Sequence, residues 1–515
     1  MMKTVFKLFA AVILLSNQAL YADDEWHELI SDHFILRTDT NLEKAKETIE
    51  KLEKYRFTIG AITNADLSAD YSPPLVVYAF EKTKRFRRVF GITGGTAGFY
   101  IPFEDGAISM LTLEEGDETW SLDGLRVLFH EYSHHILHQY SPLQYPRWYD
   151  EGFGEYLAMT DFDGDKVIIG RPAVHRFPNL KSPGSWLKLE TLLQSKGEYI
   201  GAIGGATSRK RLKTKNYIFQ QYSQGWLTTH FFQSSDKYQK KLNAYLQGIN
   251  RPGSDIDKEF KKAFGKSYAK MDKEIKRYWY NRELPSYVID LKGQIPEIEY
   301  KVRKLNEHEV KIMEPEARYL AGGSAEEIAD HIKVFEEALS NDVRPADLNL
   351  YLAELALRSK DWDKAEHYIN ILLAEKSDHA PALTLKTELM KRGKQLKELA
   401  KDQQKAVRKA TITALKADQT YVPGLMAYAR LFMEEGTKVT DNALDVMETV
   451  RFLVPDVDSA KILQVRMLAK AGKVADAKAH AQKLIDWASS SRQRKRYEDL
   501  LEEVEEKATL TASAN

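Results

Sequence analysis

The stretch Leu128–Leu137 places the strongest constraint on what this chain can fold into. It carries the pattern H-E-x-x-H, formed by His130, Glu131 and His134, inside an apolar segment of helical length. Positions four apart lie one turn apart on a helix face, so the two imidazoles can bind one metal ion. Glu131 projects beside them, where a carboxylate can take a proton from a metal-activated water. The stretch therefore predicts a helix that carries two metal ligands and a general base.

An open metal site with two histidines needs a third protein ligand, and Glu151 is the best candidate. It follows His134 by 17 positions, which leaves room for a proline-containing turn at 141–146 and a second helix beginning near Arg147. Glu155 lies one turn beyond Glu151 on the same face. Its carboxylate can accept a hydrogen bond from the outward N–H of a ligand histidine and fix that ring. Two imidazoles and one carboxylate favour zinc, although spacing alone does not exclude another divalent ion.

The H-E-x-x-H pattern followed by W-x-x-E-G at Trp148–Gly152 resembles the gluzincin zinc metallopeptidases, and in particular the secreted bacterial peptidase MA-like branch. Segments 91–100 and 222–232 share the resemblance, which covers about residues 25–280. The fold it implies is an α+β zincin-like peptidase domain with a small sheet and active-site helices. The alternative is a helix pair that holds no metal.

The resemblance also implies roles for the site residues. By this resemblance His130, His134 and Glu151 would hold Zn²⁺, and Glu131 would be the catalytic base. Tyr222 stands in the aromatic-rich helix pattern 217–232, where a gluzincin tyrosine stabilises the oxyanion, and simple packing is the alternative.

A substrate-binding strand is implied as well. Gly98, Phe99 and Tyr100 precede the metal-binding helix, where this family has a sheet edge that pairs with an extended peptide. An ordinary interior strand is the alternative.

The N-terminus has the form of a signal peptide spanning residues 1–22. Lys3 and Lys7 precede an apolar run at 8–15, and Ala22 is a small residue at the cleavage position. The run is shorter than the ~20 residues that cross a bilayer, so we expect no membrane span in the mature chain, and an uncleaved anchor is the alternative. The expected location is periplasmic or extracellular.

The composition narrows the classes of partner and of chemistry. The 75 basic and 75 acidic residues balance, so no overall field favours nucleic acid as a partner. The chain has no cysteine, which excludes disulfides, thiol catalysis and cysteine zinc ligands. Its stability must therefore come from hydrophobic cores.

Periodicity divides the chain into parts. Segments 33–38 and 75–80 predict strands, and 42–59 and 82–90 predict helices, as in a sheet backed by helices. We expect a peptidase domain at 23–284 and a connector at 285–340 to which no fold is assigned.

Beyond the connector, we expect an all-α tetratricopeptide-like solenoid at 341–515. Ala443 and Ala477 lie 34 positions apart, the period of this repeat, and Pro455 fits the end of one unit. Stacked helix pairs leave a concave face that suits a protein partner. The alternative is a helical domain that only braces the first part.

These features predict an exported zinc-dependent peptidase that acts on peptide or protein substrates and carries a protein-binding repeat module. One alternative is a non-catalytic periplasmic repeat adaptor with a vestigial peptidase fold. Retention of Glu131 speaks against it, because an adaptor has no use for the base. A zinc amidase acting on cell-wall material is a further alternative.

Overall fold

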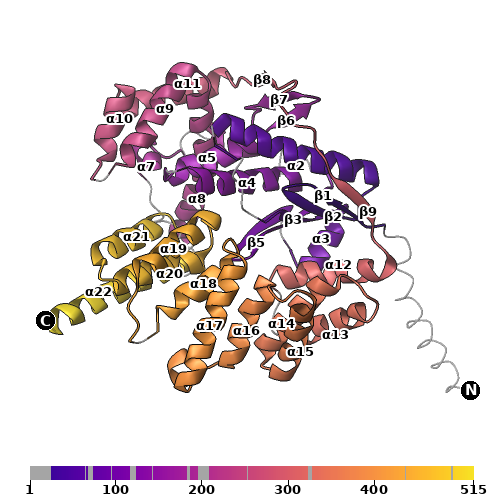
Figure 1. Cartoon of the computed structure of the whole chain (residues 1–515). Helices are drawn as coiled ribbons and strands as arrows, with labels where there is room; N and C mark the ends of the chain where they lie inside the picture. Colours follow the sequence, from indigo (N-terminus) through magenta and orange to yellow (C-terminus); the bar gives the residue numbers. More distant parts are fainter. Residues whose placement is uncertain are drawn as a thin grey trace, which may run out of the picture.

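The computed structural model describes residues 25–63, 65–67, 73–93, 96–115, 123–141, 143–181, 186–194, 208–251, 253–322, 328–434, 436–488 and 491–514. The predicted signal peptide, residues 1–22, lies outside this range. Within it, no helix has both the length and the apolar character that crossing a bilayer requires. A first part built on a β-sheet is followed by a second part that is wholly helical (Figure 1).

A six-stranded sheet forms the centre of the first part, in the order β4-β5-β3-β2-β1-β9. Its strands are β1 (His27–Ile30), β2 (Phe34–Thr38), β3 (Leu75–Phe80), β4 (Gly98–Phe103), β5 (Gly106–Thr112) and β9 (Lys301–Lys304). The pairs β2–β3 and β3–β5 are parallel, and the other neighbours are antiparallel. β4 and β9 therefore form the two edges, and the strands predicted at 33–38 and 75–80 are confirmed as β2 and β3.

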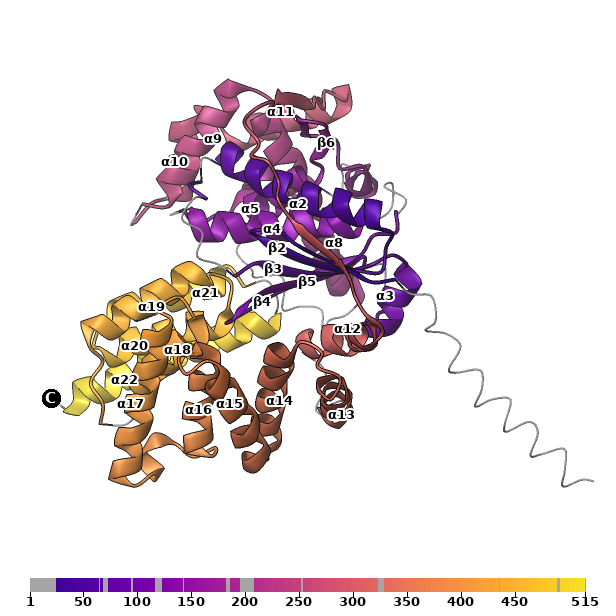
Figure 2. The same cartoon turned by 45° about the vertical axis from the view of Figure 1, so that its right-hand side comes forward.

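Helices α2 (Leu42–Thr63) and α4 (Gly124–Tyr140) lie over one face of the sheet (Figure 2). Val77 in β3 belongs to a buried cluster that reaches Ile49 of α2 and Ile136 of α4. Tyr55 of α2 stacks on Phe129 of α4 with 3.8 Å between ring centroids, and its hydroxyl donates to the Phe129 carbonyl at 2.8 Å. These contacts fix α4, which carries the predicted metal ligands His130 and His134, over the sheet.

The rest of the first part is mostly helical. It comprises α5 (Arg147–Ala158), η1 (Val174–Arg176), α6 (Phe177–Leu180), α7 (Leu189–Leu193), α8 (Ser208–Gln233), α9 (Asp236–Ile249), α10 (Ile256–Phe264) and α11 (Tyr268–Asn281). A small antiparallel sheet joins β6 (Asp161–Asp163), β7 (Lys166–Ile169) and β8 (Tyr287–Asp290).

The opposite face of the sheet is covered by α3 (Thr83–Phe90) and by the first helices of the second part, α12 (Glu307–Leu320), α13 (Ile328–Leu339) and α14 (Pro345–Ser359). Phe80 of β3 and Met110 of β5 share a buried cluster with Ile312 of α12 and Leu352 of α14. Residues 285–340, to which the sequence analysis assigns no fold, therefore supply β8, β9, α12 and α13. The helical part begins before residue 341 and is built onto the sheet.

The second part continues as paired antiparallel helices: α15 (Trp362–Glu375), α16 (Ala380–Lys391), η5 (Leu396–Glu398), α17 (Lys401–Ala417), α18 (Val422–Leu431), α19 (Asp441–Leu453), α20 (Asp458–Lys470), α21 (Val474–Asp486) and α22 (Ser491–Ala514). Ala365, Ala443 and Ala477 are fully buried on the second helix of the pairs α14/α15, α18/α19 and α20/α21. Small residues at these positions let the helices approach closely. This tetratricopeptide-like array is the helical repeat that the sequence predicts.

The even-numbered helices of the array form its inner row, because α14 contacts α16, α16 contacts α18, and α20 contacts α22. This row faces the turn between β4 and β5. Glu104 in that turn accepts hydrogen bonds from Arg430 of α18 at 2.8 Å and from Ser459 of α20 at 2.7 Å. Part of the inner row therefore binds this chain's own hairpin.

Candidate metal centre

Two helices bring the predicted ligands together. α4 begins at Gly124 after Asp123, whose side chain accepts a hydrogen bond from the Arg126 backbone N–H. Gly124 lies so close to β5 that an added Cβ would stand 2.3 Å from the carbonyl oxygen of Thr112. α5 begins after Pro146, which has extended backbone angles and ends the connecting turn. The start of each helix is thus set by local geometry.

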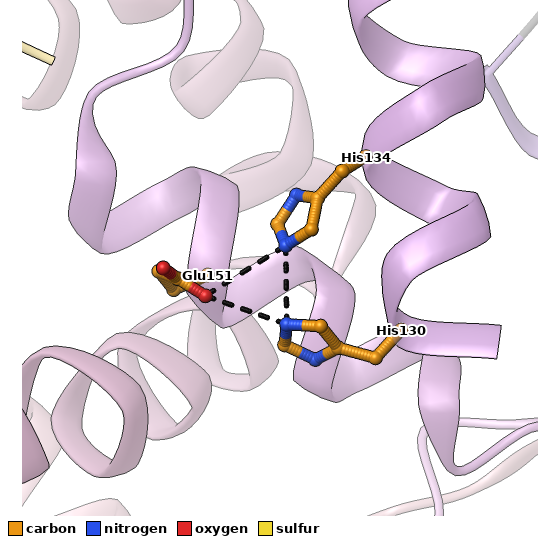
Figure 3. A group of neighbouring side chains, drawn as sticks. All are labelled: His130, His134 and Glu151. Carbon is orange, nitrogen blue, oxygen red and sulfur yellow. Dashed lines mark hydrogen bonds and ion pairs between the residues drawn. The ribbon is translucent and has the colours of Figure 1, made fainter. Parts of the chain in front are cut away.

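Three side chains from these helices converge (Figure 3). Nε2 of His130 lies 3.1 Å from Nε2 of His134, and Oε2 of Glu151 lies 3.3 Å from the first nitrogen and 3.7 Å from the second. Ligand atoms around a tetrahedral zinc ion at about 2.0–2.1 Å lie about 3.3 Å from one another. The three atoms therefore fit zinc, and within the described chain no fourth ligand joins the group.

The electrostatic surroundings suit a carboxylate ligand. Burial alone would raise the pKa of Glu151, but hydrogen bonds from His130 and His134 and the charge of Arg147 outweigh it and hold the pKa well below its usual range. Nη2 of Arg147 lies 3.4 Å from the Glu151 oxygen that faces away from the histidines. Glu151 is therefore ionised across the physiological range, as a metal ligand must be.

Glu155 lies behind His130, where the sequence analysis expects a carboxylate that could accept a hydrogen bond from this ring. Its Oε1 is 3.4 Å from Nδ1 of His130, and its carboxylate accepts hydrogen bonds from His175 at 2.8 Å and from Nε of Arg176 at 2.9 Å. Glu155 is fully buried. A Cβ added to Gly154 would lie 3.1 Å from the His130 ring, so a glycine here leaves room for the imidazole.

A second carboxylate, which the sequence analysis does not predict, lies behind His134. Nδ1 of His134 donates to Oδ1 of Asp150 at 3.0 Å, because a carboxylate can only accept. The same oxygen accepts from Nε2 of His138 at 3.1 Å, and Nδ1 of His138 donates to Asp456 at 2.7 Å. His134 thus has a hydrogen-bonded carboxylate partner, the arrangement that fixes ring orientation at metal sites, whereas Nδ1 of His130 lies 3.4 Å from Glu155 and makes no hydrogen bond with a described residue.

Glu131 and Tyr222 both lie near the three ligands. Glu131 is half-buried and makes no hydrogen bond or ion pair with any described residue. The Tyr222 ring stacks 6.2 Å from the His130 ring, and Cζ of Arg176 lies 4.9 Å from its centroid. The charge of Glu151, together with burial, raises the pKa of Tyr222 well above its usual value, so its hydroxyl keeps its proton.

β4 is the edge strand beside this site. Each of its residues from Gly98 to Phe103 pairs with β5, and within the described chain no strand pairs with its other side. Phe99 packs on Phe90 of α3 with 5.1 Å between ring centroids, whereas the Tyr100 hydroxyl lies 3.1 Å from Nδ1 of His135 on α4. Gly98, Phe99 and Tyr100 therefore lie on a strand that borders α4.

Two residues of the centre that the sequence analysis did not predict could have been found from local spacing. His138 continues the i+4 series of His130 and His134, and Asp150 immediately precedes Glu151. Asp456 gave no such signal, because it lies 318 positions from His138.

No known family model matches the chain. A Bacillus subtilis (strain 168) protein, YhcO, described as uncharacterized, is 26% identical over 243 residues; the match covers 45% of this chain and 64% of YhcO, so this chain spans less than two thirds of that relative. Two solved structures show a TM-score of 0.32 at 15% identity. A tetratricopeptide-repeat protein of Thermus thermophilus matches over 38% of this chain and 98% of its own, and yeast Tom70 over 59% and 66%. The helical repeat of this chain is defined by its own paired helices.

Proposed function

We propose that this chain is an exported zinc-dependent peptidase. The observation that supports the proposal is the triangle of His130, His134 and Glu151, whose ligand atoms lie 3.1, 3.3 and 3.7 Å apart, close to the ~3.3 Å between ligand atoms of a tetrahedral zinc site. Beside it stands Glu131, a carboxylate without a hydrogen-bonding partner among the described residues. A structural zinc site closes all four positions with protein ligands, whereas a catalytic site keeps one open.

The side chains divide the work of hydrolysis. His130, His134 and Glu151 would hold a zinc ion, which would supply Lewis acidity toward a substrate carbonyl and toward the attacking water. Glu131 accepts the proton of the attacking water and returns it to the leaving amine. The protonated hydroxyl of Tyr222 donates a hydrogen bond to the oxygen on which negative charge develops.

The edge of β4 that no described strand pairs with favours a peptide as the substrate. An extended chain that pairs with Gly98, Phe99 and Tyr100 would be held by main-chain hydrogen bonds, which demand no particular sequence. Such pairing would place the peptide along α4, close to His135 and to the metal ligand one residue before it in the helix.

Two isosteric substitutions test the proposal. Glu131→Gln removes the proton acceptor and no ligand, so zinc content should remain near one ion per chain while peptide hydrolysis falls by ~10² or more. Glu151→Gln weakens a ligand, so both zinc affinity and hydrolysis should fall. The measurements are metal content of the purified protein and cleavage of a mixed peptide library.

Three results would contradict the proposal. If the purified protein binds no zinc, the three residues do not form a zinc site. If Glu131→Gln cleaves peptides as fast as the wild type does, the activity belongs to another centre. Cleavage of cell-wall amides but of no peptide would favour the zinc amidase.

A non-catalytic adaptor is the second candidate function. The paired-helix array favours it, because stacked helix pairs commonly bind proteins, and the comparisons give catalysis no support. In this case a protein partner would bind the array equally well in the wild-type chain and in Glu131→Gln, and neither would cleave any peptide in the library.

A further inference from the structure

A line of alternating carboxylates and imidazoles connects the metal ligand His134 to the helical array. His134 donates to Asp150 at 3.0 Å, His138 donates to the same carboxylate oxygen at 3.1 Å, and His138 donates through its other nitrogen to Asp456 at 2.7 Å. The first three residues lie on α4 and α5, whereas Asp456 lies in the turn between α19 and α20. Only the last contact crosses from one part of the chain to the other.

Each contact in this line constrains the next. The bond from Nδ1 of His134 to Asp150 fixes the tautomer that leaves Nε2 free for a metal ion. Asp150 is oriented in turn by His138, whose two nitrogens both donate to carboxylates and which is therefore cationic. Burial opposes this charge, but Asp456 and Asp150 outweigh it and raise the pKa of His138 to about 10.

The part of the array that carries Asp456, from α19 to the residues just after α21, also contacts α4 and α5 at two further points. Nη1 of Arg147 donates to the carbonyl of Ala488 at 3.2 Å, and Arg147 also pairs with the ligand Glu151. The Tyr140 ring at the end of α4 meets the Phe452 ring edge-on at 6.3 Å. The array is thus seated against both helices that carry the ligands.

We propose that Asp456 is a positioning residue for the metal ligand His134 and acts through His138 and Asp150. The packing of the last helices of the array, from α19 onward, against α4 and α5 then sets the affinity of the site for zinc. The inference rests on the proposed zinc site and adds to it a dependence on the helical array.

Zinc affinity of the full chain tests this role. Metal-free wild type, Asp456→Ala and Glu104→Ala are titrated with zinc in competition with a chromogenic chelator. Glu104 is a matched control, because it too joins the first part to the array and its side chain is 25% exposed against 23% for Asp456. Loss of a hydrogen-bonded outer partner weakens metal binding by ~10- to 100-fold, so Asp456→Ala should bind zinc about tenfold more weakly, and Glu104→Ala should match the wild type.

Cobalt spectra and a conservative variant separate positioning from a general loss of structure. The visible absorption of the Co²⁺-loaded protein reports ligand geometry and should change in Asp456→Ala but not in Glu104→Ala. Asp456→Asn keeps an oxygen that accepts from His138 and should recover most of the zinc affinity. Urea unfolding of the metal-free variants checks that each is folded.

Several outcomes would overturn the inference. Equal zinc affinity and equal cobalt spectra for Asp456→Ala and Glu104→Ala would show that Asp456 does not position the metal ligand His134. Two zinc ions per wild-type chain would show that His134, His138 and Asp150, which also cluster closely enough for one, form a second metal site. A wild type that binds no zinc would remove the proposed function as well, whereas the first two results would leave it standing.

Discussion

Burial acts on the histidines of this chain in opposite ways, depending on their neighbours. His138 lies between two carboxylates, and its pKa is raised to about 10. His230 lies between neutral groups: Nε2 donates to the carbonyl of Gly170 at 2.9 Å, and Nδ1 accepts from the hydroxyl of Tyr278 at 2.7 Å. Burial there lowers the pKa of His230 to about 4. The half-buried imidazole of His138 is therefore cationic, and the buried imidazole of His230 is neutral.

The neutral His230 should make stability depend on pH. Between pH 6.5 and 4 the unfolded chain binds a proton at this residue that the folded chain does not, because the folded pKa is about 4 against an ordinary 6.5. Its contribution is complete above pH 6.5 and is lost as pH falls, by up to ~3 kcal/mol. The free energy of unfolding in urea should therefore differ between wild type and His230→Gln by less at pH 4.5 than at pH 7. His308→Gln, at an exposed site, is the control, and parallel pH profiles for His230→Gln and wild type would contradict the assignment.

The candidate metal centre shows which site residues can be predicted from their spacing in the sequence. Glu155 is found behind His130 because one turn of α5 separates it from Glu151, a distance that sequence spacing encodes. Asp150 and His138 lie on the same two helices, but an aspartate and a histidine have many roles on a helix, so spacing alone did not single them out. Asp456 is brought next to His138 only by tertiary packing, which spacing in the sequence does not encode.

Among the elements, α5 and α8 cross at a point where neither can carry a side chain. A Cβ on Gly152 would stand 2.4 Å from the carbonyl carbon and oxygen of Gly225, and a Cβ on Gly225 would stand 2.6 Å from the carbonyl oxygen of Trp148. Backbone contact of this kind fixes the distance between Glu151 on α5 and Tyr222 on α8. The glycine of the E-G pair therefore serves the site through helix packing.

Gly152→Ala should force α8 away from α5. Overpacking costs about 1–3 kcal/mol or more, and we expect the free energy of unfolding to fall by at least this amount. Gly424→Ala in α18 is the control, because its added Cβ would meet its nearest neighbour, Oγ1 of Thr384, at 3.3 Å; alanine there should be neutral or slightly stabilising. Equal effects of the two substitutions on urea unfolding would show that the α5–α8 crossing can relax.

Elements with a strong apolar pattern were predictable, and those without one were not. The helices predicted at 42–59 and 82–90 agree with α2 and α3, since buried residues recur there at helical spacing. β9 has the sequence Lys-Val-Arg-Lys, all of it exposed, and is held at the sheet edge by pairing with β1 and by the bond from Arg303 to Glu28 at 2.8 Å. α12 contains Pro315, which argues against a helix in sequence. The segment 285–340 therefore offered no readable pattern.

At the scale of the whole molecule, the sheet and the array share one interior. A buried ion network joins them: Arg37 of β2 binds Glu28 at 2.8 Å and Glu316 of α12 at 3.3 Å, and Arg344 before α14 binds Glu316 at 2.5 Å. Glu316 is fully buried. Removing the array would expose the apolar face of β3 and β5 and would leave Arg37 with only part of its compensating charge. The sequence predicts a solenoid at 341–515 as a part of its own, and the core that it shares with the sheet favours joint unfolding of the two parts.

Glu316→Gln tests this coupling. Breaking a buried ion network by removing one partner costs about 3–5 kcal/mol, here because two guanidinium groups lose their common carboxylate. We expect amides in β3 and in α14–α15 to lose hydrogen-exchange protection by the same factor. Glu314→Gln is the control on the same helix, since Glu314 pairs with Arg85 and Arg88 of α3 at 2.7 Å and is 20% exposed. It should cost about 1 kcal/mol or less. If Glu316→Gln releases α14–α15 while β3 stays protected, the array is an independent domain and the shared core does not bind the two parts into one cooperative unit.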